Sequence, residues 1–523
     1  MRYFIRLIQP LSIKKCNKEQ SSSSQESKQY ILIIRKNFIV WFALLLVYHV
    51  NAQSLKGRIL DKVTQIGIPY ATAQYATNYG TISNEEGYFT LKVPENSTDS
   101  LVISSMGYRQ ERIPITTLTK ELRIFLEPSV IELDEVLLRN RMPTAEDIIR
   151  EVRAAYPANY VSSKQKYQIF FRETSYMRFN KFDVEIDKAT AIPKKQVAKA
   201  SKSLDSLAKV IMSSSLIEFE DLSGFLLLRD KDSSKIAIDK ATKLLDSEKD
   251  FSMENVQEKA QQIILQYLDT TLTYKLKTGL FKIEDSLALN EENFTNDKKQ
   301  EFSNKGVKSS ILNAFKVSQF YELSFLDKIL TPNSYRFSLD GASFFQGHPI
   351  YVLSFVPRKS KAKFTGKLYI SASDYAVLKA DYSFSEGKEG RKFNMKLLLG
   401  IKYLENRNEG TIIFKIRTDG KYHPYYVKRE YGNFVYLHRP LKFIENSKER
   451  NKVVFDFKLE GDGREKKELL LLGNEILNLS EYKNLKEHTT IPYSLLKQFE
   501  PTIWQNNQII EPLEEMKNFK ANN

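Results

Sequence analysis

Two adjacent carboxylates, Glu85 and Glu86, are the residues whose types most directly suggest chemistry. They occur in the stretch GTISNEEGYFTLKVP, residues 80–94, between two runs in which apolar and polar residues alternate. A calcium loop needs more oxygen ligands at closer spacing than two glutamates supply. Two catalytic acids must face each other across a cleft, whereas neighbours on a strand or turn point apart. Because Gly87 can take a positive φ after Asn84, the pattern predicts a hairpin turn.

The rest of the sequence lacks the usual motifs of catalysis. After residue 52 the chain has four histidines, none of them in HExxH or HxxE: His348, His423, His438 and His488. There is no G-x-S-x-G elbow and no G-x-x-x-x-G-K-[ST] phosphate loop. We therefore predict no catalytic residue, no cofactor and no metal, and expect that the protein is not an enzyme. A hydrolase stays open as a weaker alternative, since acid pairs can assemble from distant strands.

The elements that would position any site begin after a predicted signal sequence at residues 1–52. Arg35 and Lys36 precede the apolar run 38–50, and small residues up to Ala52 suit cleavage there. The run is too short for a comfortable membrane span. The serine-rich stretch before Lys28 indicates an extended n-region or a start codon placed too early. The mature chain would lack a transmembrane span, and it would lack a thiol because the single cysteine is Cys16.

The net charge excludes some partners. The formal charge is +15, and residues 1–52 carry eight Lys/Arg and two Asp/Glu, so the mature chain would have 15 − 6 = +9. The basic residues are scattered and interleaved with acids, and an exported chain rarely meets DNA. We predict no nucleic acid partner; an anionic membrane surface or a glycan suits this charge better.

Residues 53–138 read as short strands between turn signals, which predicts a small β-sandwich. The motifs LKGRILD, GIPYATAQY, GTISNEEGYFTLKVP, LVISSMGYRQERIPI and LEPSVIELDEVLL follow in this order. Together they resemble the carboxypeptidase-regulatory-like domain of exported Bacteroidetes proteins. The resemblance implies a transthyretin-like sandwich of seven or eight strands, with Asn84, Gly87 and Gly107 at turns. The usual aspartate of that family is Asn84 here, which weakens a metal site further.

Residues 139–327 form a second predicted region. Thr144 and Asp147 are placed to cap a helix that ends near Pro157. Two strands are predicted within Lys166–Asp187, joined near Met177 to Asn180. This helix and the motif FFRE resemble a segment of exported Bacteroidetes proteins that carry the same sandwich. From residue 194 to about 327 the amphipathic, charged pattern predicts mostly helices that cover a β core.

Residues 328–523 return to alternating strands, which predict an antiparallel curved sheet or half-barrel followed by a C-terminal arm. The pattern resembles the curved sheets of periplasmic lipoprotein-carrier and lipid-binding proteins. One face of these strands is a candidate apolar ligand face, formed by Tyr335, Phe337, Leu378, Tyr382, Phe384 and Phe414. The same residues could instead be packed core, since apolar periodicity mostly reports packing. The predicted fold class is α+β, mainly β.

Two classes of function remain open. The first is a non-catalytic cell-envelope protein whose sandwich docks on an outer-membrane or periplasmic protein assembly. The second is a periplasmic carrier that holds a lipid or glycan in the C-terminal sheet. Both place the protein in the periplasm or at the periplasmic face of the outer membrane. The sequence identifies neither partner nor ligand, nor the oligomeric state.

Overall fold

The structure is a computed structural model of the chain. It describes residues 52–520 except 76–78, 95–98, 116–120, 130–142, 162–163, 214, 231, 246–267, 270, 280, 289–301 and 506. The predicted signal sequence before Ala52 and the LDEV motif at 133–136 lie outside the described residues. Contacts divide the chain into two units, and the features below belong to the larger, Ser54–Leu91 with Thr98–Asn523, apart from the first two residues of β1 and the last three of β4. The smaller unit comprises Met1–Gln53 and Lys92–Ser97.

Seven short strands form the N-terminal sandwich. One sheet has the order β4-β1-β7, from β1 (Ala52–Asp61), β4 (Tyr88–Pro94) and β7 (Glu121–Leu126). The other has the order β3-β2-β5-β6, from β2 (Thr72–Tyr75), β3 (Tyr79–Ile82), β5 (Ser100–Ser104) and β6 (Glu111–Pro114). Alternate residues such as Leu55, Ile59, Leu101 and Ile103 are fully buried. Because each strand has one apolar face, the two sheets bury these side chains in a common core.

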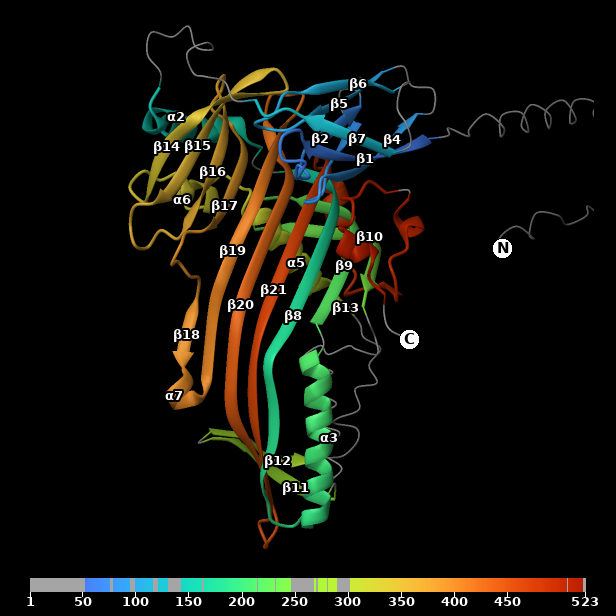
Figure 1. Ribbon diagram of the computed structural model, residues 1–523, viewed down its shortest axis with the longest axis vertical. Coiled ribbons are helices and arrows are strands. Elements are labelled where there is room, and N and C mark those ends of the chain that lie inside the picture. Colours follow the sequence, from blue (N-terminus) through green and yellow to red (C-terminus); the bar gives the residue numbers. More distant parts are fainter. Residues whose placement is uncertain are drawn as a thin grey trace, which may run out of the picture. The chain divides into compact units, whose positions relative to one another are not determined.

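A 14-stranded sheet dominates the rest of the larger unit (Figure 1). Its main order is β14-β15-β16-β17-β19-β20-β21-β8-β9-β10-β23. The first strands along this order are β14 (Tyr335–Phe345), β15 (His348–Pro357), β16 (Phe364–Ser371), β17 (Val377–Phe384) and β19 (Ile401–Ile416). The remaining strands are β20 (Tyr422–Glu445), β21 (Lys452–Ile476), β8 (Gln165–Ala189), β9 (Ser215–Leu228), β10 (Ser234–Leu244) and β23 (Ser494–Leu496). Neighbours are antiparallel except β10 and β23, which are parallel.

Three further strands extend this sheet, and two form a separate pair. The strand β11 (Thr273–Thr278) pairs with β12 (Phe281–Ala288) and with β20, and β18 (Lys392–Met395) pairs with β19. The separate pair is β13 (Phe302–Ser303) and β22 (Thr490–Ile491). The fold class predicted from sequence, α+β and mainly β, is confirmed.

The helices divide into core helices and peripheral ones. The core helices α2 (Ala145–Asn159), α5 (Asn304–Lys316) and α6 (Phe325–Ile329) share one apolar core with the sheet through residues such as Ile148, Ile311 and Leu326. A reciprocal cap between Thr144 and Asp147 starts α2, as predicted. The peripheral helices are α3 (Lys194–Ser213), α7 (Lys396–Leu399), α8 (Leu479–Asn484), η3 (Pro501–Trp504) and α9 (Glu514–Lys517). Within the described residues no helix is long and apolar enough to cross a membrane.

Three predicted boundaries differ from the structure. The two strands expected within Lys166–Asp187 are one strand, β8, because Asn180 forms a bulge where a turn was expected. Helix α2 continues past Pro157 to Asn159. Residues 215–244, expected to be helical, form β9 and β10, and 273–278 form β11. Charged residues also lie on the covered faces of these strands. Apolar and polar residues therefore do not alternate there with the two-residue period of a half-buried strand.

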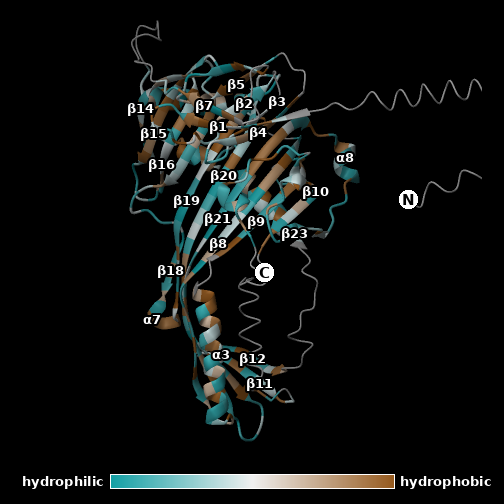
Figure 2. Ribbon diagram, turned by 45° about the vertical axis from the view of Figure 1, so that its right-hand side comes forward, coloured by the Kyte–Doolittle hydropathy of each residue, from teal (hydrophilic) through white to brown (hydrophobic). Residues whose placement is uncertain are grey.

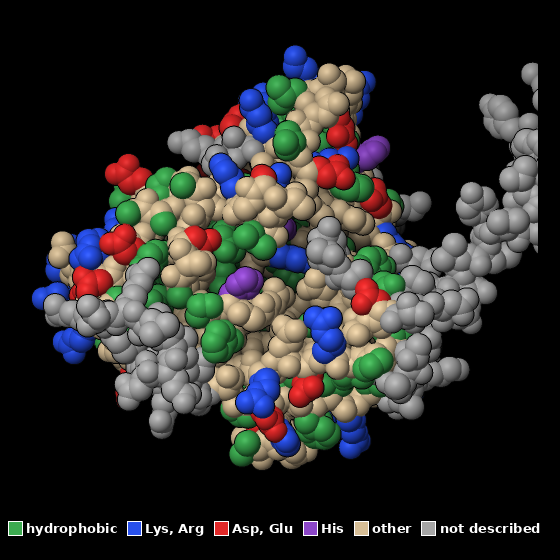
Figure 3. All heavy atoms as spheres, turned by 90° about the horizontal axis from the view of Figure 1, so that it is seen from above, with side chains coloured by type: hydrophobic (Ala, Val, Ile, Leu, Met, Phe, Trp, Pro, Cys, Tyr) green, Lys and Arg blue, Asp and Glu red, His purple; other side chains and the backbone are tan. Residues whose placement is uncertain are grey.

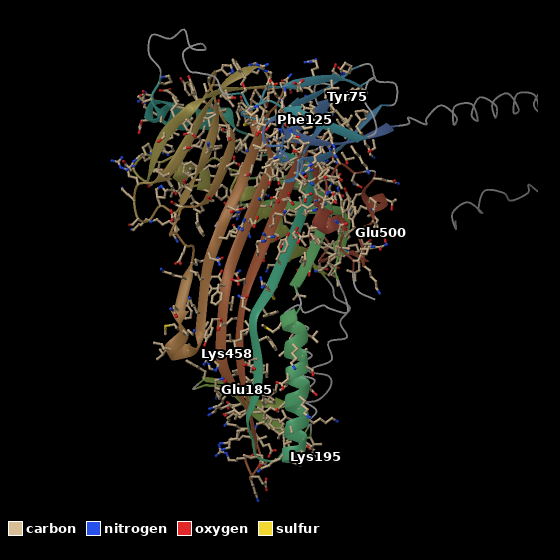
Figure 4. All side chains as sticks on the ribbon, in the orientation of Figure 1. Tyr75, Phe125, Glu185, Lys195, Lys458 and Glu500 are labelled. Carbon is tan, nitrogen blue, oxygen red and sulfur yellow. The ribbon has the colours of Figure 1, made fainter. Side chains whose placement is uncertain are left out.

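The strands β8, β20 and β21 are 25, 24 and 25 residues long, so each could span roughly 80 Å at the usual rise per residue. We call 175–189, 431–445 and 452–465 their distal part, which Glu185 and Lys458 mark in Figure 4. Helix α3 lies beside this part (Figure 2) and packs along β8 in a second core that includes Phe182, Leu204 and Phe455. Basic and acidic side chains are interspersed on the face shown in Figure 3.

Candidate functional site

The two adjacent carboxylates lie in a tight turn between β3 and β4. Gly87 has φ +86°, and a side chain there would place its Cβ 2.4 Å from the carbonyl oxygen of Ile59. The Oδ1 atom of Asn84 accepts hydrogen bonds from the backbone N–H groups of Glu86 and Tyr88, both at 2.9 Å. The turn therefore requires glycine at its end and an oxygen acceptor at its start. Gly107 has φ +90° in the turn after β5.

The side chains of Glu85 and Glu86 point to different partners. Glu85 forms ion pairs with Lys428 of β20 and with Lys466 of β21, the latter at 3.1 Å, and accepts a hydrogen bond from Tyr70 at 3.0 Å. Glu86 accepts a hydrogen bond at 3.0 Å from the backbone N–H of Glu514 in the C-terminal segment. The two carboxylates do not face each other, so they do not form a general acid and base pair.

Glu85 is the end of a row of charges that crosses the sheet. The row joins directly paired residues of four neighbouring strands: Lys428, Glu468, Arg172 and Asp221. Arg172 and Asp221 are paired through two hydrogen bonds of 2.7 Å, and their side chains are 3% and 0% exposed. Arg172 also donates to the carbonyl of Ile510 at 3.1 Å. We call Glu85, Lys428, Lys466, Glu468, Arg172 and Asp221 the junction network.

The electrostatics of the junction network favour fixed ion pairs. Burial alone would raise the pKa of Glu85, but the ammonium groups of Lys466 and Lys428 outweigh it and lower the pKa to about 2. Burial, then the nearby carboxylate of Glu85, raises the pKa of Tyr70, which stays a neutral donor. A carboxylate held ionised between two ammonium groups is a poor proton donor or acceptor near neutral pH. The arrangement suits attachment of the sandwich hairpin to the sheet.

A second row of charges lies one residue along on the opposite face, across β21, β8, β9 and β10. It consists of Lys467, Glu173, Glu220 and Lys243, again directly paired in register. Glu173 accepts a hydrogen bond from Ser310 of α5 at 2.7 Å, and Glu220 accepts one from Tyr493 at 3.1 Å.

Glu218 contacts this second row through Lys243. Burial raises the pKa of Glu218 to about 7, since the attraction of Lys243 does not fully offset burial and the repulsion of Glu220. Glu218 is therefore placed to exchange a proton near neutral pH.

The histidines do not form a ligand set. Burial lowers the pKa of His423 to about 4, and its Nδ1 lies 2.9 Å from the carbonyl oxygen of Pro424. His438 contacts Asp456 at 2.8 Å on the distal part, whereas His348 begins β15 and His488 precedes β22. In the part of the chain that the structure describes, no group of three or more His, Cys, Asp or Glu residues could hold a metal ion.

The predicted apolar ligand face belongs to the core. The structure buries Tyr335, Phe337, Leu378, Tyr382 and Phe414, and Phe384 is half-buried beside Phe364. The ring centroids of Tyr382 and Phe325 of α6 are 4.5 Å apart, and those of Phe414 and Tyr160, which follows α2, are 5.0 Å apart. Packing, the alternative weighed for this face, accounts for these contacts.

A cavity lies elsewhere, beside the distal part of the sheet. Its volume is about 460 Å³, within the usual range for small-molecule sites. Ile192, Leu272, Tyr274 and Val453 are among its apolar lining residues, and Glu445 is among its polar ones. Sequence patterns did not point to this cavity, because its walls come from β11, the turn before α3 and the β20–β21 hairpin.

Comparisons with known proteins identify one part of the chain. Residues 55–138 match the CarboxypepD_reg-like domain family, so the chain carries such a domain. No curated protein matches the chain. A crystal structure of a "putative membrane-associated protein of unknown function" from Bacteroides fragilis is 8% identical, covering 79% of this chain and 97% of the other. Its TM-score is 0.12, which carries no argument about fold or function.

Sequence patterns did not identify the residues of the junction network. Arg172, Lys428 and Lys466 are single charges in separate strands, with no motif or spacing that connects them. Their one signal is a charge at a position where strand alternation would place a covered residue, which calls for a buried partner. The partner itself depends on strand register and cannot be read from the sequence.

Proposed function

We propose that the protein is a non-catalytic component of the cell envelope whose sandwich docks on a periplasmic or outer-membrane protein. The fixed attachment of the sandwich supports this proposal. Its β3–β4 turn is held by Glu85 and by the hydrogen bond from Asn84 Nδ2 to the carbonyl of Pro512 at 3.1 Å. A module fixed in this way presents its other loops in a set orientation, which lowers the entropic cost of binding.

The turn between β1 and β2 is the loop that best suits a protein partner. Val63 and Ile66 are 77% and 68% exposed there. Asp61 Oδ1 accepts from the backbone N–H groups of Val63 and Thr64, both at 2.8 Å, and Tyr108 donates to its other oxygen at 2.9 Å. This is a turn with its geometry fixed by side-chain hydrogen bonds, and it holds two large aliphatic side chains in solvent. We assign the docking contact to Val63 and Ile66.

Site-specific photocrosslinking in the producing cells tests this assignment. A photoreactive residue at Ile66 should give one discrete adduct with an envelope protein, identified by mass spectrometry. The same residue at Lys359, exposed in the turn after β15, is the matched control. Adduct formation should fall when the variant with the photoreactive residue at Ile66 also carries Val63→Asp. Equal adducts at both positions, or none at Ile66, would contradict the proposal.

The non-catalytic character is part of the proposal and rests on the state of the carboxylates. Glu85 is neutralised by two lysines, and Glu173 and Glu220 lie in a covered row with Lys467 and Lys243. Glu218→Gln removes a carboxylate whose pKa burial raises to about 7. We expect no hydrolysis of envelope glycans or peptides by the purified protein; activity that Glu218→Gln abolishes would establish the hydrolase alternative.

A carrier of a lipid or glycan is the second candidate, and the cavity beside the distal part favours it. Its apolar lining residues suit an acyl chain, and its polar lining residues suit a headgroup or sugar. Mass spectrometry of organic extracts from natively purified protein would reveal a stoichiometric ligand. Leu272→Trp should fill the cavity and remove that ligand, whereas Val210→Trp, at a half-exposed position of α3, should retain it. A clean wild-type extract would exclude a co-purifying ligand.

A further inference from the structure

Helix α7 carries two highly exposed leucines, one of them the most exposed large apolar side chain in the described part of the larger unit. Leu397 is 104% exposed and Leu398 is 77% exposed, and Phe393 of the preceding β18 is 46% exposed. The helix lies at the end of the β18–β19 hairpin (Figure 1), which Gly400 closes with φ +65°. Adjacent leucines at the end of a hairpin, without contacts to hold them, are costly in water unless another surface covers them.

The hairpin that carries these apolar side chains is rich in basic residues. Residues 388–402 contain five basic residues and one acidic residue: Lys388, Arg391, Lys392, Lys396, Lys402 and Glu389. Arg391 and Lys392 have side chains that are 89% and 73% exposed. Lys392 has an ion pair with Glu389 at 3.4 Å, and Arg391 has one with Glu405 at 3.8 Å. Even with Glu405 included, this hairpin and its flank have five positive and two negative charges.

A second exposed apolar segment lies on the same edge of β20. Ile401 at the start of β19 pairs with Leu437, and four residues further along β20 Thr278 of β11 pairs with Leu441. After the β11–β12 turn, Phe281 and Ile283 are 52% and 54% exposed. Arg439 lies between the two hairpins, with its guanidinium 5.3 Å from the ring of Phe281.

We propose that the hairpin end formed by Phe393, Leu397 and Leu398 with Arg391, Lys392 and Lys396, here the α7 tip, inserts into the surface of an anionic lipid bilayer. Leucine side chains would enter the boundary between headgroups and acyl chains. Lysine and arginine would stay at the level of lipid phosphates, because their long stems can extend along the apolar layer. Because the α7 tip is positively charged, we expect it to favour an anionic bilayer over a neutral one. The inference does not depend on a partner at Val63 and Ile66.

Vesicle binding with a local readout tests the proposal. The single cysteine, Cys16, is replaced by serine, and Leu398→Cys carries an environment-sensitive fluorophore, so that the signal reports the α7 tip and not residues 38–50. The probe should shift to the blue with vesicles of phosphatidylethanolamine and phosphatidylglycerol. Vesicles of phosphatidylcholine alone should produce little shift, and added salt should weaken the response.

Variants identify the contributing residues. Leu397→Asp/Leu398→Asp should lower vesicle binding about tenfold or more, measured by co-sedimentation. Lys392→Glu/Lys396→Glu should lower it about tenfold on anionic vesicles only. The control Ile476→Asp/Leu495→Asp changes residues that are 74% and 58% exposed elsewhere and should bind as the wild type does. All variants should keep the wild-type unfolding temperature, because the changed side chains are exposed.

Three results would overturn the proposal. The first is absence of a probe shift on anionic vesicles. The second is equal binding of the wild type and Leu397→Asp/Leu398→Asp, or equal binding to anionic and neutral vesicles. The third is self-association of the wild type that Leu397→Asp/Leu398→Asp abolishes without any vesicle binding, which would assign the α7 tip to a second copy of the chain.

Discussion

Glu85 and Lys466 are 381 positions apart in the sequence, and their side chains form a 3.1 Å ion pair. The lysine side chain is 4% exposed and the glutamate 28% exposed, so the pair is largely withdrawn from water. Lys428 shares the same carboxylate. The contact joins a turn of the N-terminal sandwich to the centre of the long sheet, and the stability of this joint can be measured.

Glu85→Gln should lower the free energy of unfolding by about 2–4 kcal/mol, because it leaves two lysines without their shared counter-charge. Chemical denaturation checks this value. Glu86→Gln is the matched control, since the amide oxygen can still accept from the N–H of Glu514, and it should change stability by less than about 1 kcal/mol. Similar values for the two variants would refute the role given to the junction network.

Acid should weaken the same joint. The pKa of Glu85 is about 2 in the folded state, below its ordinary 4.5. The unfolded chain therefore binds more protons, and stability should fall as the pH drops through 4.5 towards 2. Urea denaturation between pH 7 and pH 3 measures this loss. The unfolding free energy should depend less steeply on pH in Glu85→Gln than in the wild type. An unchanged pH dependence would contradict the low pKa assigned to Glu85.

Glu218 should have the opposite effect at higher pH. Its folded pKa of about 7 exceeds the ordinary 4.5, so between these values the folded state holds a proton that the unfolded chain has lost. Stability from this group is present below pH 4.5 and is lost as the pH rises through 7. With the side chain 35% exposed, screening limits the loss to about 1–2 kcal/mol. Glu218→Gln should flatten this part of the stability profile, which denaturation from pH 5 to pH 8 would show.

Arg172 and Asp221 distinguish breaking a buried pair from replacing it. Arg172→Met should cost about 3–5 kcal/mol, because Asp221 is 0% exposed and would be left as an isolated charge. Arg172→Met/Asp221→Leu should recover most of that loss. Unfolding free energies of the wild type, Arg172→Met, Asp221→Leu and the double variant form a complete double-mutant cycle. If the double variant were less stable than both singles, other contacts of Arg172 would have to dominate.

Asn84→Asp tests why an amide stands in this turn. Asn84 is 1% exposed, and its Nδ2 group donates to the carbonyl oxygen of Pro512. A carboxylate can accept the two backbone hydrogen bonds of the turn but cannot make that donation. We expect a loss of about 2–3 kcal/mol near neutral pH, partly regained when acid protonates the carboxyl group. If Asn84→Asp were as stable as the wild type at pH 7, the hydrogen bond from Asn84 to Pro512 would not explain why an amide stands in this turn.

The sequence was informative where a signal is local. The turn at Gly87, the capping box of Thr144 and Asp147, and the alternation in β14 to β17 each depend on neighbouring residues. The pattern predicts two strands where β8 is one, because the polar residues around the bulge at Asn180 are also typical of a turn. It predicts helices in place of β9 and β10, because their covered faces carry charges whose partners lie on other strands.

The site was less predictable than the fold for the same reason. The alternation that marked Tyr335 and Phe414 as one face is equally strong for a lined cavity and for packed core, and only the helices packed on it distinguish the two. The α7 tip has a clear composition, KFNMKLLLGIK, but its exposure depends on where the β18–β19 hairpin ends. Exposure of an apolar run is a property of the tertiary structure.

The pairing of β8 with β21 has a consequence for the order of folding. β8 ends at Ala189 and β21 begins at Lys452, so the sheet cannot be completed until nearly the whole chain has been synthesised. Contacts over such separations form slowly, because a long loop must close first. Until then the edge of β8 that receives β21 is unpaired and open to wrong partners. A chain with this topology remains incompletely folded for longer than one built from local hairpins, and the strand edge exposed in that interval favours protection by a chaperone.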